Sequence, residues 1–359
     1  MSNRPLRRLG LEDDMVCRLI AGGLHTCNDL FSKTELQLVG LLNLNRADVA
    51  SLLSFVASKV APETRVASDL LRERREGGSF FLATGLTTID EALQGGFPTG
   101  MITEVVGPAG VGKTQICLMM AAQACLPARL GGLGERAGVV YLDTERKFSP
   151  DRLMEIASTR VPEYYAHGVD MSRSEGMTRL LEQVTVFAVD TSTDLLSRLE
   201  SLQMLIIEGN KRLIILDSVA ALARKDFAKE DMANRQEVLT RQAAVLKRLA
   251  YTFNAVVLVT NQVTTRFTPI NQTHRFQNSK TRPDGAMFEA DSDGKVGSYI
   301  TPALGNTWHH CVSNRVRFFF FHKAYREMRL CKSPLAPSVV CWYEVQDMGL
   351  KELHAYDTG

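Results

Sequence analysis

GPAGVGKT, from Gly107 to Thr114, is the stretch of sequence that decides the fold of this chain. It follows a β-rich run at 101–106 and precedes an apolar run at 115–126 that has helical length and contains no Gly or Pro. A strand, a glycine-rich loop and a helix in this order are typical of a phosphate-binding loop. The glycines let successive backbone N–H groups turn toward phosphate oxygens, and the helix N-terminus adds partial positive charge. The stretch therefore predicts a nucleotide-binding α/β domain.

Two side chains at the end of this loop have the chemistry that a nucleoside triphosphate and its metal ion require. The Lys113 ammonium can reach the β- and γ-phosphates, and the Thr114 hydroxyl can join the Mg²⁺ shell. We therefore expect ATP and Mg²⁺ as cofactors. The residues expected to surround the phosphates are Gly107, Pro108, Ala109, Gly110, Val111, Gly112, Lys113 and Thr114.

The composition is that of an ordinary globular protein. The 359 residues suffice for one large α/β domain and a small companion. A net charge of +2 gives no sign of global basicity, so any nucleic-acid site would be a local patch. The seven cysteines form no CxxC pair, which indicates reduced thiols rather than disulfides or a zinc site. Without a signal-peptide pattern or a membrane-spanning run, the sequence predicts an intracellular soluble protein.

Residues 1–60 are predicted to form a small all-helical domain. The run LVGLLNLNRADVASLL reads as helix, tight turn and helix, with Asn43 in the turn, where Asn tolerates a positive φ. Such helix-hairpin-helix units often bind DNA phosphates, but a packing or protein-contact domain fits the balanced charge equally well. Residues 61–80 are polar and contain a Gly pair, which predicts a linker. Its RERR run fits a solvated charge cluster better than a nuclear-import signal.

From residue 81 to the C-terminus, apolar runs of strand length alternate with runs of helical length. Several strands are apolar without alternation, as expected of a parallel sheet covered on both faces. Strands are expected at 101–106, 138–143, 184–189, 212–217 and 255–260, and helices at 114–126, 150–160, 192–208 and 234–252. Residues 315–345 favour short strands with tight connections. The predicted fold class is α/β, with a mostly parallel twisted sheet, helices on both faces and an antiparallel extension.

Acidic and polar residues follow three of the predicted strands, at the edge of the sheet where α/β proteins bind ligands. Glu145 comes just after VVYLD and could orient and deprotonate a water molecule that faces the γ-phosphate. Asp217 closes the apolar run of RLIILD and suits the Mg²⁺ shell. Asn261 and Gln262 end AVVLVTNQ and could sense the γ-phosphate without competing for the metal. Each residue alone could equally cap a helix or turn, but together they favour an ATP site.

Two polar stretches follow the last two strands. The first is 224–236, and the second runs from 263 to 298 without recognisable secondary structure, which usually marks a functional or disordered segment. The first half of the second stretch combines basic residues with Phe267 and Phe276, as a single-stranded nucleic-acid site does. Its second half is acidic, which weakens that prediction. Because this stretch begins directly after Gln262, occupancy of the γ-phosphate position could order or release it.

The chain resembles the RecA-like strand-exchange recombinases of eukaryotes and archaea over nearly its whole length. The motifs that carry the resemblance are LATGLTTIDEALQGGFPTG, GPAGVGKTQ, YLDTERKFSPDRL, LIILDSVAAL, VVLVTNQV and KSPLAP. The first motif and the YLDTE…F…RL pattern are specific to this family among phosphate-loop proteins. PLRRLGL, the LPARLGGL insertion and ALGNTWHH are most similar to the B-type recombinase paralogues. The resemblance implies a RecA-like ATPase core at 81–359.

The resemblance also implies a role for individual residues. Lys113, Glu145 and Gln262 would be the catalytic group, in which Glu145 positions the attacking water and Gln262 senses the γ-phosphate. Thr114 and Asp217 would hold the metal. Gln115 and Arg152 would extend the ATP site, with Arg152 packed on adenine, and Pro337 would cap the nucleotide of a neighbouring subunit. The stretches 224–236 and 263–298 would be DNA-binding loops. The basic residues expected to bind DNA are Arg224, Arg235, Arg266, Arg275, Lys280 and Arg282.

Three departures from the family pattern bear on assembly. Filament-forming members carry a Phe-x-x-Ala anchor where this chain has Thr64-Arg65-Val66-Ala67, so a hot spot worth about 2 kcal/mol is missing. Lys332 stands where filament formers have an Asp that reaches the neighbour's γ-phosphate. The second loop is longer and half acidic. Self-polymerisation through this anchor and strong binding of DNA are therefore not expected.

We accordingly expect an ATP-binding, DNA-dependent and slowly hydrolysing ATPase subunit of a recombinase-paralogue complex. The resemblance implies hetero-oligomers with other paralogues (the C-type first), action on a recombinase filament and on single-stranded or branched DNA, and a nuclear location. The alternatives are an autonomous strand-exchange recombinase and an ATP-locked assembly scaffold with little turnover. A replicative-helicase-like ring motor shares the core but not the N-terminal helical unit.

Overall fold

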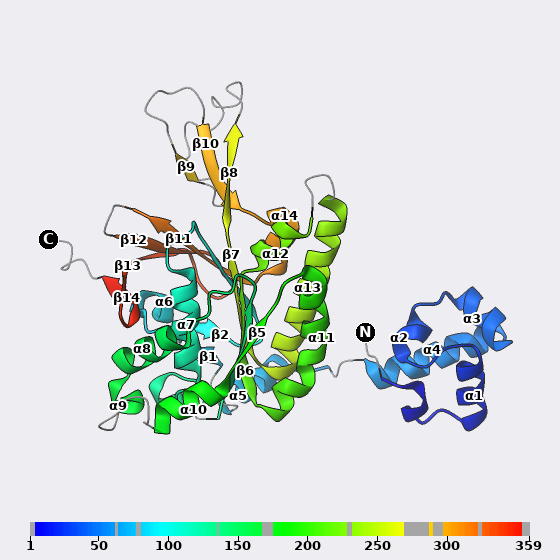
Figure 1. Ribbon diagram of the computed structural model, residues 1–359. Helices are drawn as coiled ribbons and strands as arrows, with labels where there is room; N and C mark the ends of the chain where they lie inside the picture. The colour runs from blue at the N-terminus through cyan, green and yellow to red at the C-terminus, as the bar shows by residue number, and fades with distance from the viewer. Residues whose placement is uncertain are drawn as a thin grey trace. The chain divides into compact units, whose positions relative to one another are not determined.

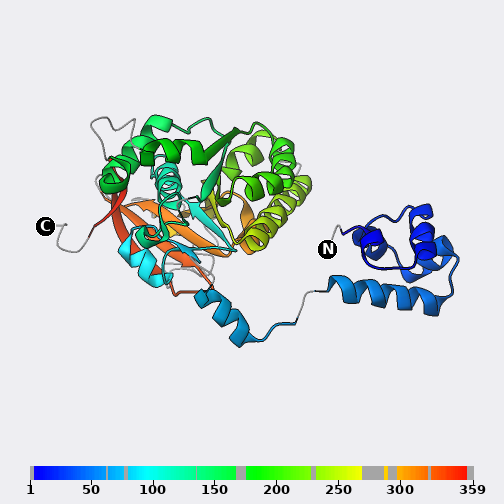
Figure 2. The same ribbon diagram turned by 90° about the horizontal axis from the view of Figure 1, so that it is seen from below.

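A computed structural model describes residues 4–61, 64–76, 80–134, 136–166, 175–227, 232–268, 287–289, 297–321 and 325–353. The chain forms two compact units, Met1–Glu76 and Gly77–Gly359. Figures 1 and 2 show the helical N-terminal unit in blue and the larger α/β unit in cyan to red.

The N-terminal unit is a small bundle of helices. Its elements are η1 (Leu6–Arg8), α1 (Asp13–Ala21), α2 (Cys27–Phe31), α3 (Glu35–Leu42) and α4 (Arg46–Val60). Leu19, Leu38 and Val49 are fully buried in its core. Thr26 and Thr34 each form a capping box at the start of a helix. Asn43 has a φ of 50° between α3 and α4, which confirms the predicted tight turn.

The predicted linker contains a helix that the sequence analysis did not anticipate. Residues Ala67–Glu76 form α5, with Leu70 and Leu71 about half exposed. The helix is rich in charged residues, and none of its side chains at 67–72 is buried, so no apolar periodicity marked it in the sequence.

The larger unit is built on a nine-stranded sheet. Its strand order is β14-β13-β12-β11-β3-β7-β6-β4-β5. The strands are β3 (Ile102–Val106), β4 (Gly138–Asp143), β5 (Val184–Ala188), β6 (Lys211–Asp217), β7 (Val256–Asn261), β11 (Asn314–Phe320), β12 (Arg326–Lys332), β13 (Val339–Gln346) and β14 (Gly349–Leu353). From β5 to β11 all neighbours pair in parallel, and β12 to β14 extend the sheet antiparallel. The five predicted core strands are confirmed to within one residue at each end. The short strands expected in 315–345 are also present, with β11 and β12 paired antiparallel.

Helices cover both faces of the sheet, as Figures 1 and 2 show. Two clusters of buried apolar residues form the cores of this unit. One face carries α7 (Lys113–Ala124), α8 (Pro150–Arg160) and α10 (Glu175–Gln183), and the other carries α11 (Ser192–Glu208), α13 (Met232–Phe253) and α14 (Gly305–Cys311). The shorter elements are β1 (Phe81–Leu82), α6 (Thr87–Ala92), β2 (Phe97–Pro98), η2 (Ala128–Leu130) and α9 (Pro162–Tyr165). The predicted α/β fold class is confirmed. Within the described residues, no helix is long and apolar enough to cross a membrane.

The prediction that 263–298 lacks secondary structure is wrong. Strands β8 (Val263–Thr268), β9 (Met287–Glu289) and β10 (Gly297–Pro302) form a separate antiparallel sheet in which β10 lies between the other two. This sheet projects above β7 in Figure 1. Val, Thr and Phe in β8 favour a strand. The strand is short, however, so these residues do not form a pattern that distinguishes it from a polar loop.

The predicted first loop, 224–236, is shorter than expected. Helix α12 (Val219–Lys225) runs into its start, and α13 already begins at Met232. Both helix ends are polar and exposed, so hydrophobic periodicity could not locate them. Arg224 and Arg235 therefore lie on helices rather than in a loop.

Candidate nucleotide-binding site

The predicted phosphate loop connects β3 to α7 at the centre of the sheet. Gly110 and Gly112 have φ angles of 76° and 108°, which favour glycine. A Cβ atom at Gly107 would lie 2.8 Å from the backbone oxygen of Phe318 and 2.9 Å from a Val111 methyl carbon. The glycine spacing is thus required by the path of the backbone and by the neighbouring strand β11.

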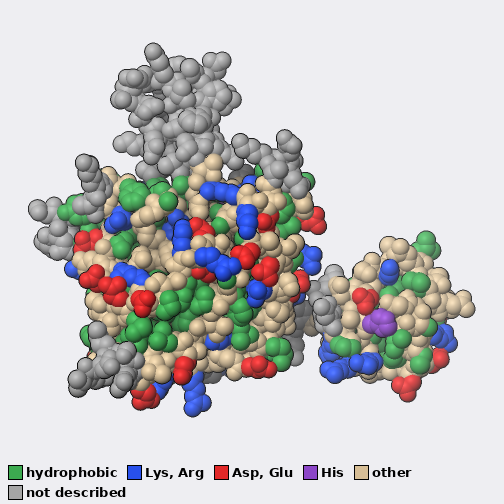
Figure 3. All heavy atoms as spheres, viewed as in Figure 1, with side chains coloured by type: hydrophobic (Ala, Val, Ile, Leu, Met, Phe, Trp, Pro, Cys, Tyr) green, Lys and Arg blue, Asp and Glu red, His purple; other side chains and the backbone are tan. Residues whose placement is uncertain are grey.

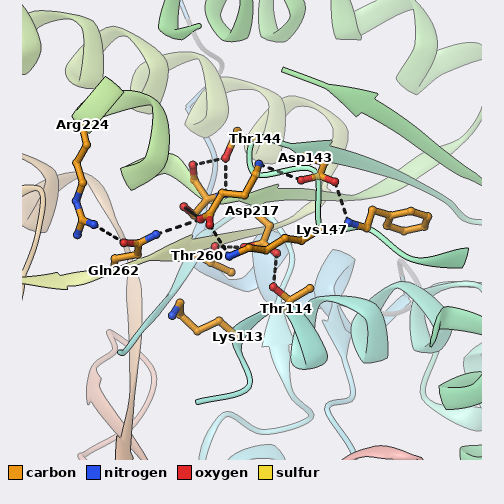
Figure 4. Close-up of polar contacts among 12 residues, drawn as sticks. Lys113, Thr114, Asp143, Thr144, Lys147, Asp217, Arg224, Thr260 and Gln262 are labelled. Atoms are coloured by element: carbon orange, nitrogen blue, oxygen red, sulfur yellow. Dashed lines mark hydrogen bonds and ion pairs between the residues drawn. The ribbon is translucent and has the colours of Figure 1, made fainter. Parts of the chain in front are cut away.

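Lys113 begins α7 and lies against its own loop. Its ammonium group donates hydrogen bonds to the backbone oxygens of Gly107, at 2.9 Å, and Pro108, at 2.7 Å. Burial lowers the pKa of Lys113, and the nearby carboxylates of Asp217 and Glu145 oppose that shift. These contacts hold the ammonium group against the first residues of the loop. Figure 4 shows Lys113 beside Thr114 at the start of α7.

Thr114 and Asp217, the two predicted metal-binding residues, are in direct contact. The Thr114 hydroxyl donates a hydrogen bond of 2.7 Å to one carboxylate oxygen of Asp217, and the Tyr141 hydroxyl donates to the same oxygen at 2.9 Å. Thr260 donates to the other oxygen at 2.5 Å. Asp217 is 6% exposed at the end of β6. One hydroxyl and one carboxylate suit Mg²⁺, which keeps several waters and binds through few protein oxygens together with substrate phosphates.

Glu145 follows β4 and faces the end of β6. One carboxylate oxygen accepts hydrogen bonds from Ser218, at 2.7 Å, and from Gln262, at 3.1 Å. The other accepts from Lys147 at 2.5 Å. Burial acts to raise the pKa of Glu145, but the hydrogen bonds of Lys147 and Ser218 and the charge of Lys147 hold it below its ordinary value. The group is an ionised carboxylate at neutral pH.

Gln262 connects the site to the first predicted DNA-binding segment. Its side-chain nitrogen donates to Glu145, and its side-chain oxygen accepts a hydrogen bond from Arg224 at the end of α12. Figure 4 shows Arg224 and Gln262 in line with the residues at the ends of β4 and β6. Asn261, by contrast, is fully buried and donates to Glu104 at 2.7 Å. The prediction that Asn261 senses phosphate alongside Gln262 is therefore wrong, because its side chain points into the core.

Arg152 lies on α8 and is held by groups of two other elements. Its side chain donates to Gln115 at 2.9 Å and to the backbone oxygens of Gln346, at 2.6 Å, and Asp347, at 3.1 Å. Gln346 and Asp347 also line an open depression of about 370 Å³. Arg152 and Gln115 therefore meet beside the turn between β13 and β14, while their predicted contact with adenine stays a prediction.

The segment that precedes β13 contains the residues expected to serve a neighbouring subunit. Pro337 is exposed there. The Lys332 ammonium donates to the backbone oxygens of His309 and Val312, both at 2.7 Å, at the C-terminal end of α14. Burial lowers the pKa of Lys332. Its charge thus stabilises a helix end of its own chain.

The basic residues predicted to bind DNA fall into two groups. Arg224 and Arg235 are described, and they bind the two ends of the antiparallel strand pair β8 and β10 (the β8–β10 hairpin). Arg224 donates to the Val263 oxygen at 3.4 Å, and Arg235 donates to the Ala303 oxygen at 3.0 Å. Burial lowers the pKa of Arg235. Arg266 lies on β8, but its side chain is outside the described residues, as are Arg275, Lys280 and Arg282. On the face shown in Figure 3, basic and acidic side chains are interspersed.

A buried ion pair behind the phosphate loop was missed by the sequence analysis. Glu104 on β3 is fully buried and accepts hydrogen bonds from Arg315, at 2.5 Å, and Trp308, at 2.9 Å. Arg315 is 3% exposed. A Glu within the apolar run MITEVV was the available signal, because a buried carboxylate requires partners.

The fold and this site define a RecA-like ATPase core joined to a helical N-terminal domain. The Rad51 family model matches residues 77–353, and a model described as an XRCC3/RpoA-like helix-hairpin-helix domain matches residues 6–60. The chain belongs to the Rad51 family. Membership implies nucleotide binding with Mg²⁺, and the members of this family are ATPases.

The similarity to curated relatives extends over nearly the whole chain. DNA repair protein RAD51 homolog 2 of Homo sapiens is 36% identical over 98% of this chain and 89% of the relative. The proteins of the same name from Mus musculus and Arabidopsis thaliana are 37% and 30% identical, over 98% of this chain in both cases and 98% and 92% of the relatives. The expected resemblance to a recombinase paralogue is confirmed.

Proposed function

We propose that this chain is an ATP-binding, DNA-dependent ATPase subunit of a recombinase-paralogue complex, which supports homologous-recombination repair of DNA double-strand breaks. The observation that carries the proposal is a continuous series of contacts. Thr114 binds Asp217 beside the phosphate loop, and Ser218, the next residue after Asp217, binds Glu145. Glu145 in turn binds Gln262, and Gln262 binds Arg224 at the end of α12. A group that reads the γ-phosphate is thereby joined to the roots of two predicted DNA-binding segments.

Each residue has a distinct task in this proposal. The loop N–H groups and Lys113 bind the triphosphate, and Thr114 and Asp217 supply oxygen atoms for Mg²⁺. Bound Mg²⁺ would neutralise charge on the β- and γ-phosphates. Glu145 orients a water molecule and accepts its proton at a carboxylate oxygen. Gln262 and Arg224 change their contacts as the γ-phosphate is bound or lost, which biases the β8–β10 hairpin between two arrangements.

The chain would act in the nucleus within a hetero-oligomer. Its partners would be other recombinase paralogues, the C-type first, and its task would be to help a recombinase assemble on single-stranded or branched DNA. The name shared by the relatives, DNA repair protein RAD51 homolog 2, supports the part of this proposal that concerns DNA repair. Thr64 stands at the position of the anchor Phe, so the chain lacks the aromatic side chain through which filament formers polymerise.

The test is ATP turnover by the purified full chain, alone and with the C-type paralogue, with and without single-stranded DNA. Lys113→Ala and Glu145→Gln are measured beside the wild type, and ATP binding is measured separately. Turnover that rises with partner or DNA and disappears in both variants supports the proposal. Tight ATP binding without turnover under every combination contradicts the ATPase role.

One observation favours a second candidate, an assembly scaffold that holds ATP and rarely hydrolyses it. Glu145, the proposed base, is bound by three donors, Ser218, Gln262 and Lys147. A carboxylate held in this way is a weak base. If Glu145→Gln leaves assembly and repair in cells unchanged while Lys113→Ala abolishes both, the scaffold is the better description.

A further inference from the structure

The contact between Lys147 and Glu145 differs from the other contacts of the site in the carboxylate oxygen that it uses and in the exposure of the donor. Both residues lie on the loop between β4 and α8, and the Lys147 ammonium is 2.5 Å from the carboxylate oxygen that neither Ser218 nor Gln262 binds. Lys147 is 59% exposed, whereas Glu145 is 21% exposed. The cation therefore binds the one oxygen of the proposed base that the other donors leave free.

The position of Lys147 opposes proton transfer to Glu145. A carboxylate has about four lone-pair positions, and three donors already occupy three of them. The ion pair also stabilises the charged form of the carboxylate, so Glu145 has less tendency to take a proton from water. The same contact acts on both groups, because it lowers the pKa of Glu145 and raises the pKa of Lys147, as expected of an ion pair that stabilises both charged forms.

We propose that Lys147 is an inhibitory positioning residue that binds the carboxylate of Glu145 and thereby slows ATP hydrolysis. This inference rests on the proposed ATPase function. It adds that a contact within the same site limits the rate of ATP hydrolysis. It provides a physical reason why turnover would be slow in a chain with a complete phosphate loop.

Other charged groups near Glu145 do not share this position. Lys113 faces it from α7, but its ammonium group is bound to loop carbonyl oxygens. Arg224, on α12, reaches it only through Gln262. The acidic neighbours are Asp143, at the end of β4, and Asp217, at the end of β6. Lys147 is thus the cation in direct contact with Glu145 among the described residues.

The experiment compares steady-state ATP turnover of the full chain with that of Lys147→Met, Lys147→Arg and Lys247→Met. Methionine keeps the length of the side chain without its charge, and arginine keeps the charge. Lys247 is exposed on α13 and serves as a matched control. Because Lys147 is largely exposed, its substitution leaves the core intact, and thermal melting verifies folding.

Release of an exposed ion pair corresponds to a rate change of about twofold to fivefold. We therefore expect kcat of Lys147→Met to rise by about that factor while KM for ATP is unchanged, because the contact acts on the base and not on the phosphate loop. Lys147→Arg and Lys247→Met should keep the wild-type kcat. If Lys147 had only a structural role, its substitution would not raise kcat while KM stays unchanged.

Two results would overturn the inference and leave the ATPase proposal in place. In the first, the wild type hydrolyses ATP and Lys147→Met has the same kcat. In the second, kcat falls in Lys147→Met, which would mean that the cation assists the reaction. If neither the wild type nor Lys147→Met hydrolyses ATP although both bind it, the inference and the ATPase proposal fail together.

Discussion

The guanidinium of Arg224, at the end of α12, donates a hydrogen bond to the side chain of Gln262, at the end of β7. The same arginine contacts the backbone oxygen of Val263, the first residue of β8. Arg235 binds Ala303, just after β10. Two arginines from the first predicted DNA-binding segment therefore hold the two roots of the β8–β10 hairpin, and one of them also holds the proposed γ-phosphate sensor.

Arg224→Gln should uncouple DNA from ATP turnover. The substitution removes a charge-assisted hydrogen bond from Gln262, and couplings between sites are typically about 1–3 kcal/mol. We expect stimulation by single-stranded DNA to fall by about fivefold or more, with ATP affinity nearly unchanged. The measurement is turnover against DNA concentration. Arg248→Gln, at an exposed position of α13, is the control, and equal losses in the two variants would contradict the coupling.

Asp217→Asn should weaken Mg²⁺-dependent ATP binding by about tenfold or more, because it removes the carboxylate that the proposed metal site contains. Three hydroxyl groups donate to Asp217, so its loss should also lower the free energy of unfolding by about 1–3 kcal/mol. ATP binding with and without Mg²⁺ is the measurement. Tyr141→Phe removes one of these hydrogen bonds without changing charge and should keep the Mg²⁺ dependence. Retention of that dependence in Asp217→Asn would place the metal elsewhere.

Arg315→Met should be among the most destabilising single changes in the α/β unit. It leaves Glu104 buried with Trp308 and Asn261 as neutral partners, and breaking a buried ion pair typically costs about 3–5 kcal/mol. Both tryptophans, Trp308 and Trp342, lie in this unit, so urea unfolding followed by tryptophan fluorescence reports on it.

The double variant Glu104→Gln with Arg315→Met separates charge burial from packing. Removing both charges should recover a large part of the lost stability, because no uncompensated carboxylate remains. If the double variant is no more stable than Arg315→Met, the cost lies in packing and hydrogen bonding around Trp308 rather than in charge.

The burial of Lys211 should make the free energy of unfolding depend on pH in the alkaline range. The side chain is 5% exposed, its ammonium donates to the Gln183 oxygen at 2.7 Å, and burial lowers its pKa below the ordinary 10.5. Between the lowered pKa and 10.5 the folded state holds fewer protons than the unfolded state. The free energy of unfolding should therefore rise with pH over that interval.

Lys211→Met should remove this rise. Urea unfolding at about pH 7 and about pH 9.5 measures it, and the change with pH is compared rather than the level, because the variant also leaves Gln183 without its donor. Lys247→Met, at an exposed position, should keep the wild-type dependence. An identical pH dependence in wild type and Lys211→Met would mean that Lys211 titrates normally in the folded chain.

Much of the fold could be predicted from the sequence because its signals are local. The core strands 138–143 and 212–217 are continuous apolar runs, and Ser149 with Pro150 marks the start of α8 by capping chemistry. The β8–β10 hairpin and the ends of α12 and α13 could not be located in this way. They are polar, so neither the periodicity of two nor that of 3.6 residues appears in them.

In the site, too, contacts that follow from local sequence could be predicted, whereas contacts between distant segments could not. Thr114 and Asp217 could be expected to meet, because parallel strands present their carboxyl ends at one edge of a sheet. The actual partners of Asn261, Arg235 and Lys332 depend on contacts between segments distant in sequence, such as the end of α14 for Lys332. A single sequence carries no direct record of such pairs, so the intrachain partners of Arg235 and Lys332 could not be predicted, while their roles toward DNA and phosphate stay predictions.

The crowding of Gly107 by Phe318 has a consequence for the synthesis of this protein. The strand that carries the phosphate loop pairs with β7 on one side and with β11 on the other, and both are translated long after the loop itself. At cellular rates of elongation the ribosome needs about 10 to 40 s to travel from the loop to the end of β11. Throughout that time the nascent chain has a complete nucleotide-binding motif but lacks the strand that packs against its first glycine. A message truncated before β11 would therefore yield a product that contains every residue of the motif without the strand that packs against Gly107.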